Sequence, residues 1–154
     1  MLKRIPTVLI LLLALSLTAV VPATAAEAPV GTRVNIVVGV PATLPADTAF
    51  HVLHGWGIQT NLVTGVGAAD FRLDVDGIEL GAGKLVNTTP APGIVSKLWL
   101  YNFEDGLPAG PHVLTGHWFL PCEPAVASGL YGGICETPNA PVEVITISLP
   151  ITFT

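Results

Sequence analysis

The fold class of this sequence is decided by the stretch Phe71-Arg72-Leu73-Asp74-Val75-Asp76-Gly77-Ile78. Its apolar and charged side chains alternate, which is the pattern of a β-strand with one buried face and one solvated face. The pair Asp76-Gly77 matches the two-residue turn of a β-hairpin, because both residue types accept positive φ. We therefore expect a strand before this turn and an antiparallel return over residues 78–86.

Similar short runs recur along the chain between clusters of Gly, Pro, Asn and Asp. They cover residues 32–40, 50–58, 94–103, 112–120 and 142–153. This spacing is typical of an all-β sandwich or barrel, and helical periodicity is absent after residue 26. The run 94–103 is apolar on both faces, which predicts a central strand. Pro150 cannot donate to a ladder, so we expect it at a sheet edge or a bulge.

Residues 1–26 are predicted to be a secretory signal peptide. Lys3 and Arg4 precede an almost unbroken apolar run over residues 8–21, and Ala23-Thr24-Ala25 supplies small residues at the cleavage positions. The run is shorter than the ~20 residues that span a bilayer, so we expect cleavage after Ala25 or Ala26 instead of an anchor, and no later membrane span. Residues 27–154 would then form one secreted or periplasmic domain.

The two cysteines, Cys122 and Cys135, are expected to form a disulfide bond, because export takes the chain to an oxidising compartment. In the chain-entropy model such a short closed loop contributes about 3 kcal/mol of stability. A redox or metal-binding thiol pair would have the closer C-x-x-C spacing. The bond would hold a stretch that contains three glycines.

Composition and charge exclude some classes of protein. Beyond residue 4 the chain has four Lys and Arg but eleven Asp and Glu, a net charge of −7 that would repel nucleic-acid phosphates. The chain is 51% hydrophobic and only 11% charged, which argues against disorder.

About seven strands are expected, the number found in an immunoglobulin-like sandwich. The stretch Leu98-Trp99-Leu100-Tyr101-Asn102-Phe103, followed by Leu107-Pro108-Ala109-Gly110-Pro111-His112, resembles the penultimate hairpin of secreted bacterial immunoglobulin-like domains. In those domains an L-P-A-G-x-H/Y corner enters a strand. The resemblance implies an antiparallel immunoglobulin-like sandwich and no particular activity. Cys122 and Cys135 are too close in sequence to be the pair that joins the two sheets of such domains.

The histidines are the obvious candidates for a metal site. His51 and His54 are three residues apart on one predicted strand, so they point to opposite faces, and His112 and His117 also diverge. A site would require pairing across strands, for example of His54 with His112 or His117. We expect ordinary strand histidines, with no bound metal or cofactor. The stretch Asp74 to Gly77 resembles the start of a calcium loop but lacks its third ligand and distal Glu.

Two aromatic residues are candidate contacts to a protein or glycan partner. Trp56 lies between Gly55 and Gly57, which have no side chain to cover it, and Tyr131 lies in the loop that the disulfide would close. Packing remains the expected role of Trp99 and Trp118, and it is also favoured over recognition for Trp56 and Tyr131. In addition, Asn87 begins a glycosylation sequon, which matters only in a host that glycosylates exported proteins.

No enzyme is expected. The serines beyond residue 26 are Ser96, Ser128 and Ser148, and none stands in a G-x-S-x-G elbow. The sequence therefore predicts a non-enzymatic exported module, binding or structural, of the cell envelope or extracellular space. Its best candidate surface is the loop between Cys122 and Cys135. The alternative is a small metal- or carbohydrate-binding protein that uses His54, His117 and Trp56.

Overall fold

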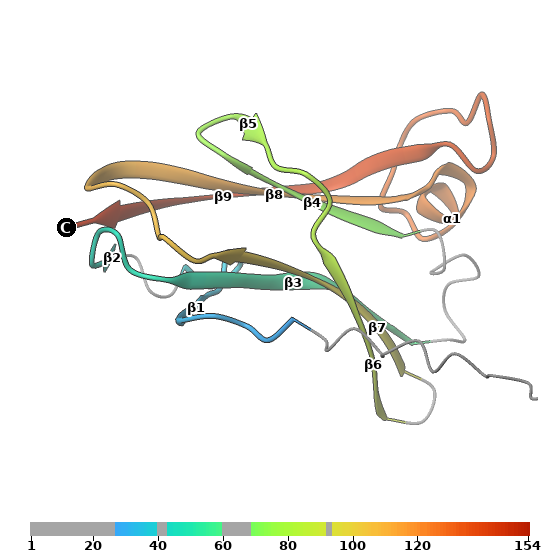
Figure 1. Ribbon diagram of the computed structural model, residues 1–154. Helices are drawn as coiled ribbons and strands as arrows, with labels where there is room; N and C mark the ends of the chain where they lie inside the picture. The colour runs from blue at the N-terminus through green and yellow to red at the C-terminus, as the bar shows by residue number, and fades with distance from the viewer. Residues whose placement is uncertain (1–26, 40–42, 60–68, 92–93) are drawn as a thin grey trace, which may run out of the picture.

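Two β-sheets pack face to face in the computed structural model, which describes residues 27–39, 43–59, 69–91 and 94–154 (Figure 1). One sheet has the strand order β1-β3-β7-β6 and the other the order β2-β9-β8-β4-β5. The prediction of an all-β sandwich is confirmed. The sheets are mixed, because β1 pairs parallel with β3 and β2 pairs parallel with β9, while the other pairs are antiparallel. The predicted signal peptide lies outside the described residues.

Four of the predicted strands agree with observed ones to within two residues, namely those now labelled β3, β7, β8 and β9. In the described residues the strands are β1 Thr32–Val34, β2 Thr43–Leu44, β3 Phe50–Gln59, β4 Asp70–Val75, β5 Ile78–Glu79, β6 Lys84–Ala91, β7 Ile94–Phe103, β8 Gly110–Pro121 and β9 Pro141–Phe153, and the helix is α1 Cys122–Ala127. The strand β7 lies between β3 and β6, so its predicted central position is confirmed. The helix was not expected, because six residues are too few to show a helical period.

The hairpin that decided the fold class forms as predicted at its turn. Asp76 and Gly77 have φ values of 54° and 79°, and Val75 pairs with Ile78. The expected return over residues 78–86 was wrong in its extent, because β5 ends at Glu79. After one further hydrogen bond, from the Leu80 amide to the Leu73 carbonyl, the chain crosses to the other sheet and forms β6.

The first predicted strand is also shorter than expected. It ends at Val34 instead of residue 40, because the Asn35 side chain accepts hydrogen bonds from the Val37 and Val38 amides. The Asn35 carbonyl also accepts one from the Gly39 amide. An asparagine that caps its own downstream backbone favours a turn over a ladder. The turn leaves Val38 exposed.

The chain between β7 and β8 differs from the hairpin that the resemblance implied. These strands belong to different sheets, so the corner between them crosses from one layer to the other. Gly106 adopts a φ of 69° in this corner, and the Asp47 amide donates to the Leu107 carbonyl. The corner is therefore held by the chain that enters β3.

Phe71 lies at the centre of the core. Its ring contacts the rings of Trp118, Tyr101 and Trp99 at centroid distances of 4.8, 6.1 and 6.4 Å. These rings come from alternating apolar positions on the inner faces of the two sheets, on β7 in one sheet and on β4 and β8 in the other. The expected packing of Trp99 and Trp118 is confirmed, since both are buried.

Pro150 lies on a strand edge, as its missing amide hydrogen predicted. The Thr154 amide donates to the Leu44 carbonyl of β2. Because backbone amides alternate in direction along a strand, the nitrogens of Thr152 and Pro150 face the same side, away from β8. Among the described residues, β2 pairs only with Thr152 and Phe153 on that side. The bulge in β9 lies elsewhere, at the register shift opposite Trp118 and Phe119.

Gly55 provides a test of how closely β3 and β7 approach. A Cβ at this position would overlap the Lys97 carbonyl oxygen and the Trp99 ring. We expect Gly55→Ala to lower the free energy of unfolding by about 2 kcal/mol, measured by urea denaturation, because backbone has to move. Gly81→Ala is the matched control, since its Cβ would meet open space, and we expect a change within about 0.5 kcal/mol. Equal stability of the two variants would contradict the close approach.

Candidate functional site

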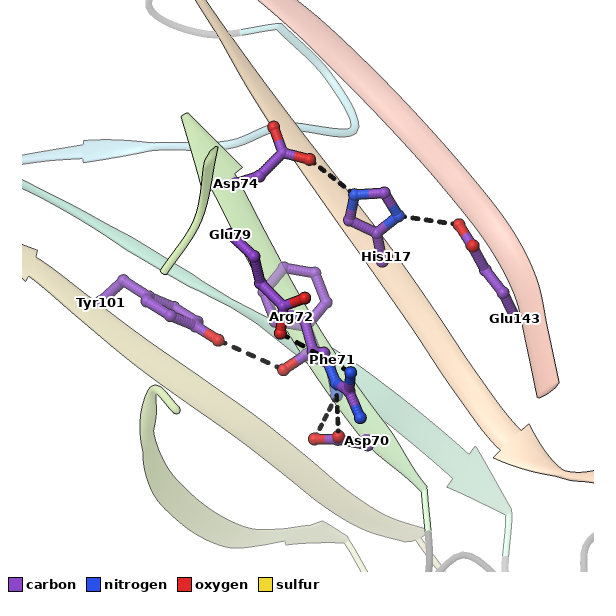
Figure 2. Close-up of polar contacts among 8 residues, drawn as sticks. All are labelled: Asp70, Phe71, Arg72, Asp74, Glu79, Tyr101, His117 and Glu143. Carbon is purple, nitrogen blue, oxygen red and sulfur yellow. Dashed lines mark hydrogen bonds and ion pairs between the residues drawn. The ribbon is translucent and has the colours of Figure 1, made fainter. Parts of the chain in front are cut away.

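The solvent-facing side of β5-β4-β8-β9, here called the outer face, carries a cluster of charged side chains (Figure 2). His117 on β8 lies between Asp74 on β4 and Glu143 on β9. Its Nε2 is 2.7 Å from Asp74 Oδ2, and its Nδ1 is 2.8 Å from Glu143 Oε1. The three strands are adjacent in the sheet, so one imidazole links all of them.

Both ring nitrogens of His117 face carboxylates, which accept hydrogen bonds and do not donate them when ionised. The ring therefore carries two N–H groups and is an imidazolium. Burial lowers the pKa of His117, but the hydrogen bonds to Asp74 and Glu143 outweigh it and raise the pKa. The pKa of Glu143 is lowered by hydrogen bonds from Thr146 and His117.

The same geometry speaks against a shared metal ion. The two nitrogens of an imidazole point in opposite directions, so one ion could not be bound by His117 and both carboxylates. In the described ranges, no group of three or more His, Cys, Asp or Glu side chains has a metal-binding arrangement.

Arg72 occupies the neighbouring part of the outer face. Its guanidinium lies 3.2 Å from Asp70 and 3.6 Å from Glu79, and it stacks over the Phe119 ring at 4.7 Å. These ion pairs are partly exposed and contribute little stability individually. A depression of about 310 Å³ separates this group from His117, and its lining comprises Arg72, Asp74, Gly77, Glu79, His117, Phe119 and Glu143.

His112 makes a second pair of contacts at the start of β8. Its Nδ1 lies 2.7 Å from Asp76 Oδ2, and its Nε2 lies 3.0 Å from the Pro108 carbonyl. Both partners are acceptors, so this ring also needs two N–H groups. The Asp76 hydrogen bond raises the pKa of His112, and the His112 and Val113 donors lower the pKa of Asp76. The hairpin turn is thus attached to β8 through Asp76.

The structure does not bring His54 together with His112 or His117. His54 lies on β3 with its ring perpendicular to that of Trp118, at a centroid distance of 5.4 Å, and its Nε2 is 3.1 Å from Asn35 Oδ1. Burial, followed by the charge of Arg33, lowers the pKa of His54. His51 Nδ1 lies 2.7 Å from the Val30 carbonyl. The pairing of histidines across strands that a metal site would require is therefore not observed.

Trp56 does not present an exposed ring. It is 8% exposed, and its indole nitrogen donates to the Asp70 carbonyl across the two sheets. The glycine before it allows β3 to approach β7 closely, which is a packing role. Tyr131 is half-buried and packs against the core, and a Cβ at Gly133 would overlap its ring. Neither residue offers the open aromatic platform considered from the sequence.

The predicted disulfide bond between Cys122 and Cys135 is present, with a Cα–Cα distance of 5.7 Å. We call residues 122–135 the disulfide segment. It lies at the end of the sandwich opposite the C-terminus, and it begins with α1 (Figure 1). Cys122 and Ala125 are buried, so the helix is seated on the core.

Apolar side chains face solvent on the disulfide segment. Val126 and Leu130 are each more than two-fifths exposed, and Ile134 is 92% exposed. The Leu130 and Tyr131 amides both donate to the Ala125 carbonyl, which folds the chain back after α1. Sequence reasoning did not single out Leu130 and Ile134. The sequence signal that could have indicated their exposure is the occurrence of apolar residues, without strand-like alternation, in a glycine-rich loop.

Within the described ranges, no helix has the length and apolar character needed to cross a bilayer. Comparison with protein-family models found no match. Comparisons with curated proteins and with solved structures found no significant match. Any function is therefore inferred from the geometry of this chain.

Asp76→Asn tests the attachment of the hairpin turn to β8. Asparagine tolerates positive φ, so the variant removes only the charge and the strong acceptor. We expect it to lower the free energy of unfolding by about 1 kcal/mol at pH 6, measured by urea denaturation. Because the pKa of Asp76 is lowered in the fold, the difference should shrink as the pH falls through that pKa.

Asp47→Asn is the matched control for this variant. Asp47 also has positive φ, at 53°, but no histidine of the described ranges contacts its carboxylate. We expect no pH-dependent difference for it. The same loss in both variants would show that the pairing with His112 does not stabilise the turn.

Proposed function

We propose that this chain is an exported immunoglobulin-like domain that acts as a non-enzymatic binding or structural module of the cell envelope or extracellular space. The strand order supports an immunoglobulin-like fold. The order β1-β3-β7-β6 follows the A-B-E-D order of one sheet of such domains, and β2-β9-β8-β4-β5 follows the A′-G-F-C-C′ order of the other. The parallel pairing of β1 with β3 is a departure from that scheme.

The corner before β8 gives further support. In many immunoglobulin domains a tyrosine near the start of strand F donates to backbone a few residues upstream. Here His112 stands near the start of β8, and its Nε2–H donates to the Pro108 carbonyl. The histidine thus makes a contact of the same kind at an equivalent place in the topology.

One observation carries the binding role, namely the exposed apolar side chains on the disulfide segment. Val126, Leu130 and Ile134 would lie on a surface that the disulfide bond and α1 already order. Preordering lowers the entropy cost of recognition, and complete burial of an isoleucine side chain contributes about 2 kcal/mol or more. We infer a partner protein with a complementary apolar surface.

The chemistry of the outer face supports a non-enzymatic role. Both nitrogens of His117 are engaged by carboxylates, and both nitrogens of His112 by acceptors. Neither ring has a free nitrogen to serve as a general base while these contacts last. The charged groups of this face act on one another and stabilise the sheet.

Ile134→Asp tests the proposed contact surface. The protein is used as a cross-linking bait in the exported fraction of its host, with Ile78→Asp as the matched control. Ile78 is 71% exposed but lies on the hairpin, away from the disulfide segment. We expect partner recovery to fall at least about tenfold for Ile134→Asp, which corresponds to 1.4 kcal/mol, and to be kept by Ile78→Asp. Equal recovery by both variants would contradict this surface.

Removal of the disulfide bond tests whether the ordering of the disulfide segment strengthens binding of the partner. We expect the Cys122→Ser/Cys135→Ser variant to lose about 3 kcal/mol of stability and to bind its partner more weakly, while the β-sheet circular dichroism survives. The reason is that the unbridged segment has to be ordered on binding. Unchanged affinity in a folded variant would remove the disulfide segment from the binding surface.

A further inference from the structure

The hairpin formed by β4 and β5 is attached to the rest of its sheet largely through β8. Beyond Glu79 the chain leaves this sheet, so the outer side of the hairpin has only the two-residue strand β5. His112 and His117 of β8 both contact the hairpin, the first at its turn through Asp76 and the second in β4 through Asp74. Figure 2 shows the second of these contacts.

All four contacts of the two rings require an N–H group on the imidazole nitrogen, so both rings have to be protonated on both nitrogens. The four partners of the two rings are three carboxylates and one backbone carbonyl, namely Asp74, Asp76, Glu143 and Pro108. None of these groups can donate a hydrogen at neutral pH. A neutral imidazole has a single N–H, so loss of one proton breaks one contact of that ring and turns its lone pair toward an acceptor.

The surrounding charges add to this requirement. His117 faces Asp74 from β4 and Glu143 from β9, and Arg72 and Glu79 line the same depression. His112 faces Asp76 from the turn, while β9 places the Phe153 ring against it, at a centroid distance of 5.6 Å. Three carboxylates thus contact two imidazolium rings directly, and deprotonation would leave negative charges uncompensated.

We propose that His112 and His117 form a proton-dependent latch, which holds the β4–β5 hairpin against β8 and β9 while both rings are protonated and loosens it when the protons leave. Loosening would alter the depression on the outer face, because Asp74 and Gly77 of the hairpin form part of its wall. The proposal goes beyond the binding role of the disulfide segment and does not depend on it.

The directions of the pKa shifts predict how the stability of the fold changes with pH. The folded pKa of His112 is raised by Asp76, and that of His117 is raised because its two hydrogen bonds outweigh burial. A raised pKa stabilises the fold fully below the unfolded value near 6.5, and this stabilisation is lost as the pH rises through the folded pKa. The lowered pKa values of Asp76 and Glu143 give the opposite loss in acid.

The test is amide hydrogen exchange on the disulfide-bonded protein between pH 5.5 and 9, expressed as protection relative to the intrinsic exchange rate. The reporters are the amides of Asp76, Leu80 and Val113, which hydrogen-bond within or onto the hairpin. We expect their protection to fall at least about tenfold across this range, while the amides in the centre of β3 and β7 keep theirs.

The variant His112→Gln/His117→Gln should show low, pH-independent protection at the three reporters, and the control His54→Gln should behave like the wild type. Constant protection in the wild type, or the same fall in the double variant, would overturn the proposal. If the double variant does not fold, nuclear magnetic resonance titration of the wild-type rings decides, since a titration midpoint at or below 6.5 for either ring would also overturn it.

Discussion

The sandwich depends on three aromatic side chains that hydrogen-bond from one sheet to the other. The Trp56 indole donates to the Asp70 carbonyl, the Trp118 indole to the Gly55 carbonyl, and the Tyr101 hydroxyl to the Phe71 carbonyl. Each side chain buries a large apolar surface and satisfies a backbone carbonyl that would otherwise be costly inside the core. These contacts fix how β3 and β7 lie over β4 and β8, and therefore where the outer face and the disulfide segment stand.

Much of the fold could be predicted from the sequence because alternation is a local property. A strand with one buried face can be recognised from a few consecutive residues, and the Asp76-Gly77 turn can be recognised from two. The early end of β1 could not be predicted in the same way, since the Asn35 side chain competes with a ladder that an apolar pattern equally favours. The crossover after Glu79 was missed because it depends on contacts with distant parts of the chain, and α1 was missed because six residues show no helical period.

The candidate site was less predictable, for a physical reason. His117 was recognised as a candidate, but its partners Asp74 and Glu143 are 43 and 26 residues away, and only strand register brings them together. Packing was the favoured role of Trp56, but its neighbouring glycines left a contact role open, because the sequence does not show that Gly55 lets β7 approach. The exposed Ile134 was overlooked because an apolar residue in a loop carries no pattern of its own.

The disulfide bond closes a short stretch of chain, since its two cysteines are 13 positions apart, and no other cysteine occurs in the sequence. A single chain can thus form only one internal pairing, so oxidation cannot trap it in a wrongly bridged form. Formation of this bond would accordingly need an oxidant and no rearrangement of wrongly paired cysteines within the chain.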